Sequence, residues 1–125
     1  MKKILLLCML LISSCTSINE MKKLDIKEEN NVVEIRYLRR WIYGADYVIT
    51  DGNKIQAILD CLDNIIVMNE VNYEVTDFTD ILVLVYKDGT EKMYEFEEYN
   101  IVLDSRRYAV SGITELRKTL EEVIR

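Results

Sequence analysis

The chain of 125 residues contains no histidine and no proline, and only four glycines and three cysteines. Without histidine, the Ser-His-Asp and Cys-His catalytic sets are excluded, together with the commonest transition-metal ligand. Without proline and with little glycine, a low-complexity linker of the usual kind is excluded. One tryptophan and two phenylalanines are few for a core, so we expect the aromatic residues to be needed inside the domain.

Acidic residues outnumber basic residues by 22 to 16, which gives a formal net charge of −6. An acidic domain repels the phosphates of nucleic acids and anionic lipid headgroups, so we expect neither as a partner. Half of the residues are apolar, which predicts a folded chain rather than a disordered one. The length fits one small domain with one core.

The amino terminus has the pattern of a secretory leader. Lys2 and Lys3 precede an unbroken apolar run, Ile4–Ile12, and two serines follow it. This order of basic, apolar and small residues is typical of a signal peptide. The run is nine residues long, whereas a membrane-spanning helix needs about 20. We therefore do not expect it to remain as a transmembrane anchor.

The end of this leader, Ile12-Ser13-Ser14-Cys15, resembles the lipobox of bacterial lipoproteins. The resemblance implies that the thiol of Cys15 receives a diacylglyceryl group and that cleavage before it leaves a lipidated amino terminus. Two acyl chains attach a protein stably to a membrane, whereas one chain holds it only marginally. An ordinary signal peptide with a chance cysteine and a buried helix of a cytosolic protein are the alternatives.

This resemblance divides the chain into a signal peptide at 1–14, a lipidated cysteine with a flexible tether at 15–31, and a single domain at 32–125. Two basic residues and no acidic residue leave with the leader, so the mature chain carries a net charge of −8. The lipid therefore has to supply the attachment, which places the protein on the extracytoplasmic face of the cell membrane. Fifteen extended tether residues reach at most ~50 Å. A short frayed helix over Glu20–Glu28 is the alternative to a flexible tether.

Alternation and helical spacing after residue 31 predict an α+β domain. We expect a curved antiparallel sheet of about five to seven strands with two amphipathic helices packed on one face. Ile81–Tyr86 has six apolar residues without alternation, which predicts a central strand covered on both faces or nearly so. Asp88-Gly89 predicts a hairpin. The expected strands are 32–43, 46–49, the two pieces 65–68 and 71–75 of one stretch broken at Asn69-Glu70, 81–86, 91–96, 101–103 and 108–110.

Two helices complete the predicted domain. The first begins at Thr50 or Asp51 as its cap and ends near Asn64. The second is capped by Ser111 and has an apolar stripe facing the sheet. Its expected solvent-facing residues are Arg117, Lys118, Glu121 and Glu122.

The order of these elements resembles a small domain of uncharacterised lipoproteins from Gram-positive bacteria. The matching parts are Ile49-Thr50-Asp51 leading into the first helix, the Lys87–Thr90 hairpin, the short hairpin at Tyr108 and the closing helix. The resemblance covers 32–125, its motifs are structural, and it implies no activity.

Trp41, Tyr43 and Tyr47 cluster around Gly44 and are the candidate ligand-binding residues. Aromatic side chains beside a turn can stack on a sugar ring or grip a peptide. The alternative is that they fill the core or the sheet face.

Several charged residues have a functional and a structural interpretation. The arginines could receive an acidic partner or a cell-wall phosphate, or they could protect an edge strand. The acidic groups could bind calcium, but they match no EF-hand loop, so we predict neither a metal nor a cofactor. Cys61 is left without a disulfide partner and is either a reactive thiol or a small buried hydrophobe. The arginines in question are Arg36, Arg39, Arg40, Arg106 and Arg107. The acidic groups are Asp77 with Asp80, and Glu95 with Glu97 and Glu98.

These observations predict a non-enzymatic, membrane-anchored interaction or ligand-binding domain with an unknown protein or cell-wall partner. An inhibitor or immunity-type protein that inserts Asn69–Asp80 into a secreted enzyme is one alternative. A cell-envelope hydrolase that uses carboxylates alone is the other.

Overall fold

The structure is a computed structural model that describes residues 21–39, 45–72 and 79–125. Eight strands in these ranges form one antiparallel sheet, and two α-helices pack against it. In chain order the elements are β1 (Lys22–Lys23), η1 (Glu29–Asn31), β2 (Val32–Arg39), β3 (Ala45–Ile49), α2 (Gly52–Asp63), β4 (Ile66–Glu70), β5 (Asp80–Tyr86), β6 (Glu91–Phe96), β7 (Asn100–Leu103), β8 (Arg106–Ser111) and α3 (Ile113–Val123).

The α+β class and the antiparallel sheet are confirmed, but the expected number of five to seven strands was wrong. The order across the sheet is β1-β4-β8-β7-β6-β5-β2-β3, and each neighbouring pair runs antiparallel. The additional strand is β1, in which Lys22 pairs with Val67 and Lys23 with Ile66. A strand of two residues is too short to show alternation, so its sequence carries no strand signal.

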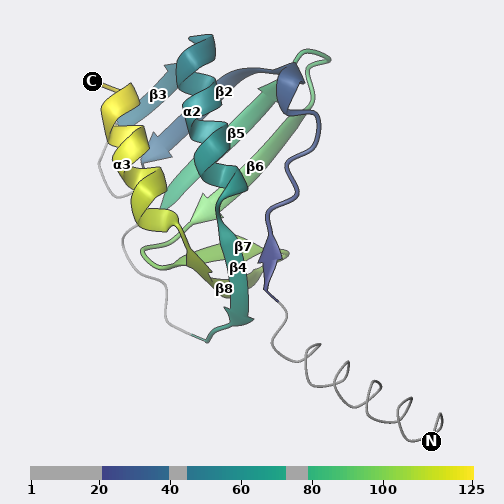
Figure 1. Cartoon of the computed structure of the whole chain (residues 1–125), viewed down its shortest axis with the longest axis vertical. Coiled ribbons are helices and arrows are strands. Elements are labelled where there is room, and N and C mark those ends of the chain that lie inside the picture. The colour runs from purple at the N-terminus through teal and green to yellow at the C-terminus, as the bar shows by residue number, and fades with distance from the viewer. Residues whose placement is uncertain (1–20, 40–44, 73–78) are drawn as a thin grey trace, which may run out of the picture.

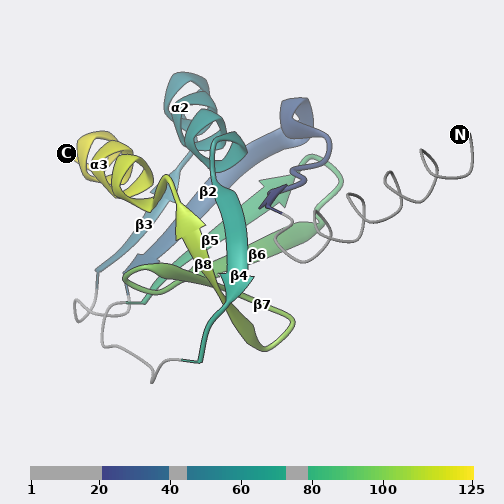
Figure 2. The same cartoon turned by 60° about the horizontal axis from the view of Figure 1, so that its bottom comes forward.

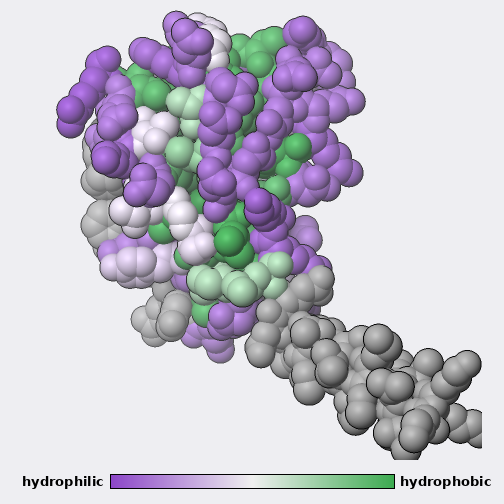
Figure 3. Space-filling view, in the orientation of Figure 1, coloured by the Kyte–Doolittle hydropathy of each residue, from purple (hydrophilic) through white to green (hydrophobic). Residues whose placement is uncertain are grey.

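Helices α2 and α3 lie side by side on one face of the sheet, over β2, β3 and β5 (Figures 1 and 2). The helix surface turned to solvent is largely hydrophilic (Figure 3). Asp51 is the cap of α2, because its carboxylate accepts hydrogen bonds from the backbone N–H groups of Asn53 (2.9 Å) and Lys54 (3.0 Å). The helix residues that enter the core are Ile55, Ile58, Leu59 and Leu62 of α2, and Ile113, Leu116 and Leu120 of α3.

Strand β5 is an interior strand, paired with β2 on one side and β6 on the other, but only one of its faces is covered. Leu82 and Leu84 are fully buried beneath the helices, whereas Val83 on the opposite face is half-buried. Of the expected cover on both faces or nearly so, complete burial is found on one face and partial burial on the other. Val83 lies in register with Met93, which is 60% exposed, so an apolar pair is open to solvent on the outer face of the sheet.

The segment Lys22–Glu28, named here the strap, packs against the domain that was expected to begin at Val32. Leu24 is buried in the core, and Ile26 is partly buried against it. The hydroxyl of Tyr86 donates a hydrogen bond of 2.9 Å to the carbonyl oxygen of Lys27. Two apolar residues in a polar segment show no period, which is why this part of the predicted tether was not recognised as packed.

The start of α3 differs from the prediction. Ser111 belongs to β8 and does not cap the helix. The cap position is held by Gly112 at φ 89°, so no side chain accepts a hydrogen bond from the first turn of α3. Within residues 21–39, 45–72 and 79–125, no helix is both long enough and apolar enough to cross a membrane.

Candidate ligand-binding cavity

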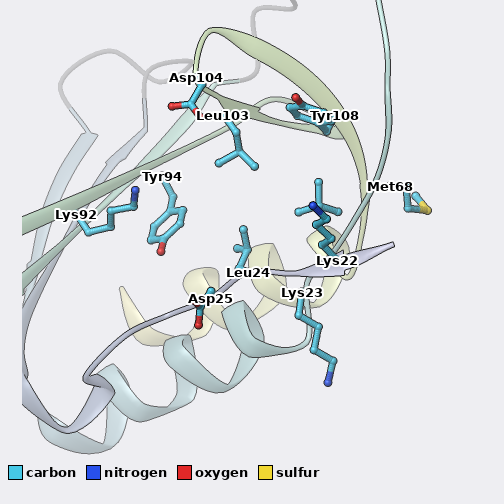
Figure 4. Close-up of a pocket in the computed structure, with 11 residues that line it drawn as sticks. Lys22, Lys23, Leu24, Asp25, Met68, Lys92, Tyr94, Leu103, Asp104 and Tyr108 are labelled. Atoms are coloured by element: carbon cyan, nitrogen blue, oxygen red, sulfur yellow. The ribbon is translucent and has the colours of Figure 1, made fainter. Parts of the chain in front are cut away.

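One hollow, named here the strap cavity, has a volume of about 550 Å³ and lies between the strap and the sheet (Figure 4). The sheet curls so that β4, β7 and β8 cross the end of β6, and the strap closes the space between them (Figure 2). Five strands therefore contribute to one concave site. The apolar and aromatic part of its lining is Leu24, Val67, Met68, Tyr94, Leu103 and Tyr108.

Tyr94 is the buried aromatic wall of this cavity. Only 4% of it is exposed, and its burial raises the pKa of the phenol to about 12. The hydroxyl is therefore neutral at physiological pH and can donate a hydrogen bond. The ammonium group of Lys92 lies 5.6 Å from the centre of the Tyr94 ring, within the range of a cation–π contact.

The charged part of the lining consists of three lysines and two aspartates, in a chain whose net charge is −6. In Figure 4 the side chain of Lys22 extends toward the cavity from the strap and Lys92 lies on the opposite side, whereas Lys23 points away. None of the ion pairs between described residues involves these lysines. With Lys23 turned away, the cavity combines an apolar interior with two lysines, Lys22 and Lys92, and two aspartates, Asp25 and Asp104.

A second cavity of about 350 Å³ continues along the strap. It shares Asp25, Lys92 and Tyr94 with the strap cavity and extends to Tyr86 and Thr90. Because both hollows have these three residues in their walls, they adjoin one another along the strap and β6, and the two together are named here the groove.

The aromatic candidates from the sequence are not part of this groove. Tyr47 is partly buried and stacks on Tyr37, with ring centres 6.0 Å apart and an interplanar angle of 30°. It also lines a separate cavity of about 260 Å³ beside the end of α3. Trp41 and Tyr43 lie outside the described residues, as does Cys15.

The described arginines of the basic cluster form ion pairs within the domain, apart from Arg106, which is exposed. Arg39 pairs with Glu121 at 2.5 Å, and Arg107 with the buried Glu97 at 2.8 Å. Arg36 pairs with Glu34 and Glu91. Protection of an edge strand does not explain Arg36 and Arg39, because β2 lies between β3 and β5. Arg40 lies outside the described residues.

The acidic candidates are dispersed. Asp80 pairs with Arg117 across 3.4 Å, and Glu97 pairs with Arg107. In the part of the chain that the structure describes, no group of three or more histidine, cysteine, aspartate or glutamate residues could hold a metal ion. Asp77 lies outside that part.

Two further polar features lie away from the groove. Cys61 is partly buried against the core, and its thiol donates a hydrogen bond of 3.2 Å to the hydroxyl of Thr119. A hydrogen bond with Asp63 is the main cause that raises the pKa of Glu29 to about 7; partial burial and the negative charges of Asp63 and Asp60 add to it. Glu29 lines neither cavity of the groove.

The chain matches no protein-family model, no curated protein and no solved structure. Its function is therefore inferred from the leader sequence and from the geometry of the groove. Sequence reasoning did not find the groove, because its walls come from segments up to 86 residues apart, from Lys22 to Tyr108. The strand expected at 91–96 carries Lys92 and Tyr94, but no local pattern indicates which other segments meet it at the cavity.

Proposed function

We propose that this protein is a lipid-anchored, extracytoplasmic lipoprotein whose α+β domain binds a small ligand and catalyses no reaction. The sequence Ile12-Ser13-Ser14-Cys15 supports the anchor. The strap cavity supports ligand binding, and it is the observation that carries this part of the proposal. Its volume of about 550 Å³ lies within the roughly 300–1,000 Å³ that is common for small-molecule sites.

The position of the strap relative to Cys15 connects the two parts of the proposal. Lys22 follows Cys15 by seven residues, which span at most about 25 Å when fully extended. A lipidated Cys15 would therefore hold the strap, and the cavity beside it, close to the membrane surface. The predicted tether of 15–31 allowed about twice this distance.

The arrangement of acidic residues favours binding over hydrolysis by carboxylates. A carboxylate-based hydrolase needs two acidic groups facing one cleft, with one pKa raised so that it can donate a proton. Among the described residues, the carboxyl group with the raised pKa is that of Glu29, which lies outside the groove. The inhibitor interpretation depends on Asn69–Asp80, of which residues 73–78 lie outside the described ranges.

Metabolic labelling with palmitate tests the anchor. We expect the full chain, expressed in bacteria, to incorporate the label and to fractionate with membranes. Cys15→Ser should abolish both results, whereas Cys61→Ser should change neither, because Cys61 lies in α2. An unlabelled wild-type chain would overturn the proposed anchor.

A further inference from the structure

We propose that β3 is a docking strand, along which an extended segment of a partner protein adds one further strand to the sheet. This role is additional to the proposed ligand binding, because no residue of β3 lines the groove. Among the described residues, the backbone of β3 forms hydrogen bonds with β2 and with no other segment. The opposite edge of β3 therefore presents N–H and C=O groups to which another strand can pair.

The two ends of the sheet differ in how they are protected against such pairing. β1, at one end, has two residues, and both are exposed lysines. Short edge strands and lysine side chains prevent association through an edge. β3, at the other end, has five residues, contains neither lysine nor proline, and keeps an unbroken register with β2. The fold thus protects one end of the sheet and leaves the other suited to pairing.

The exposed side chains of β3 indicate the chemistry of the partner segment. Asp46 and Val48 lie on the outer face of the sheet, and Val48 is 64% exposed. In an antiparallel pair, a residue of the added strand lies directly opposite each of them on the same face. A lysine or arginine opposite Asp46 and an aliphatic residue opposite Val48 would complement these two side chains.

The inner face has room for one further side chain of the added strand. A hollow of about 260 Å³ lies between β3 and the end of α3, and Tyr47 forms part of its wall. The apolar walls come also from Val123 and Ile124, and the polar walls include Asp51, Lys54 and Arg125. A residue opposite Tyr47 projects to this face, and β-branched side chains pair favourably with aromatic ones across strands. We therefore expect valine or threonine at that position of the partner.

A second copy of the chain fits this edge less well than a foreign segment. If two β3 strands paired antiparallel about Tyr47, Asp46 of each copy would lie opposite Val48 of the other, and neither carboxylate would gain a cation. β3 also offers only five residues, whereas stable interfaces between folded proteins involve about 20–30 residues on each side. An extended peptide gains its affinity from main-chain hydrogen bonds and a few side chains, so it needs no larger surface.

Fluorescence anisotropy with a labelled, end-blocked peptide of sequence Thr-Val-Val-Lys-Thr tests the proposal. Antiparallel to β3, its second residue lies opposite Val48, its third opposite Tyr47 and its lysine opposite Asp46. The full chain carries Cys15→Ser in every sample, so the lipid anchor does not contribute. We expect one peptide per chain, with a dissociation constant below about 1 mM.

Methylation of the peptide's backbone nitrogens tests main-chain pairing. The second and fourth amides point to one edge of the extended peptide, and the third and fifth point to the other. Because only one edge faces β3, methylating one of these sets should weaken binding roughly ten-fold, and methylating the other should leave it within about two-fold.

Variants of the chain place the peptide on β3. Val48→Lys should weaken binding roughly five-fold. Met93→Lys adds the same charge at a similarly exposed position of the interior strand β6 and should have little effect. Asp46→Lys should weaken the lysine peptide about three-fold and strengthen a peptide with glutamate in place of lysine by a similar factor. Circular dichroism confirms that each variant is folded.

Absence of saturable binding, equal effects of Val48→Lys and Met93→Lys, or equal effects of methylation on the two edges would overturn the proposal. Sedimentation of the chain without peptide reports a second copy at this edge. A dimer that Val48→Lys dissociates would also overturn the proposal, because the chain itself would then occupy β3. Palmitate labelling at Cys15 is a separate measurement, so loss of the docking strand leaves the proposed anchor standing, and the converse also holds.

Discussion

The guanidinium group of Arg117 on α3 lies 3.4 Å from the carboxylate of Asp80 at the start of β5. Arg117 also donates hydrogen bonds to the carbonyl oxygens of Glu97 (2.6 Å) and Glu98 (2.5 Å). Asp80 is almost fully buried and shares a hydrogen bond with Tyr37. One side chain thus joins the last helix, the interior strand β5 and the turn after β6.

Replacing Arg117 with methionine should lower the free energy of unfolding by about 2–3 kcal/mol, because a buried carboxylate loses its cation and two carbonyl groups lose their donor. Urea denaturation measures the loss. The neighbouring Lys118 is exposed, so Lys118→Met should stay within about 0.5 kcal/mol of wild type. Equal effects of the two substitutions would contradict the assigned role of Arg117.

Leu24→Ala tests whether the strap belongs to the folded domain. Leu24 is 8% exposed, and removing a buried leucine side chain should cost about 2 kcal/mol, near the lower limit for such substitutions because the site is at the edge of the core. Met21 is 66% exposed, so Met21→Ala provides the matched control. A wild-type melting temperature for Leu24→Ala would show that the strap does not contribute to stability.

The raised pKa of Glu29 predicts that the stability of the fold depends on pH. The folded chain keeps the Glu29 proton up to a pKa of about 7, above the ordinary value of 4.5. Between these values the folded state binds more protons than the unfolded state, so the free energy of unfolding falls as the pH rises. Glu29→Gln should therefore raise the melting temperature at pH 8 and leave it unchanged at pH 4. Glu122 is exposed, so Glu122→Gln should change the melting temperature by the same small amount at pH 4 and at pH 8.

Gly112→Ala should destabilise the fold by about 1–2 kcal/mol, since a side chain is strained at positive φ. Its φ is 89°, and an added Cβ would lie 3.2 Å from the carbonyl oxygen of Asn64. Gly52→Ala is the control, because nothing lies within 4 Å of its added Cβ. Thermal unfolding should separate the two variants, and a neutral Gly112→Ala would refute the strain at this position.

Sequence patterns predicted the structure correctly where the residues that form the pattern lie within one short segment. The strand Glu91–Phe96, the turn at Asp88-Gly89 and the α2 stripe through Ile55 and Leu62 are all found where they were expected. In these cases the turn pair or the three-and-four spacing that predicts the structure lies within the segment itself.

Long-range contacts explain the failures. Arg117 was expected to face water, but its side chain is 28% exposed and pairs with Asp80 of β5. Glu121 is 44% exposed, as expected, but it also pairs with Arg39 of β2. Leu24 enters the core only because β1 pairs with β4. The strap cavity arises from the curl of the whole sheet, which no single segment encodes.

The pairing of β1 with β4 has a consequence for shortened versions of the chain. A fragment beginning at Val32, where the sequence patterns place the domain boundary, would lack Lys22 and Lys23 and leave the backbone groups of Ile66 and Val67 without their partners. Unpaired strand edges template association with other molecules. Such a fragment should therefore self-associate, even though all the residues of both helices and of the seven longer strands would still be present.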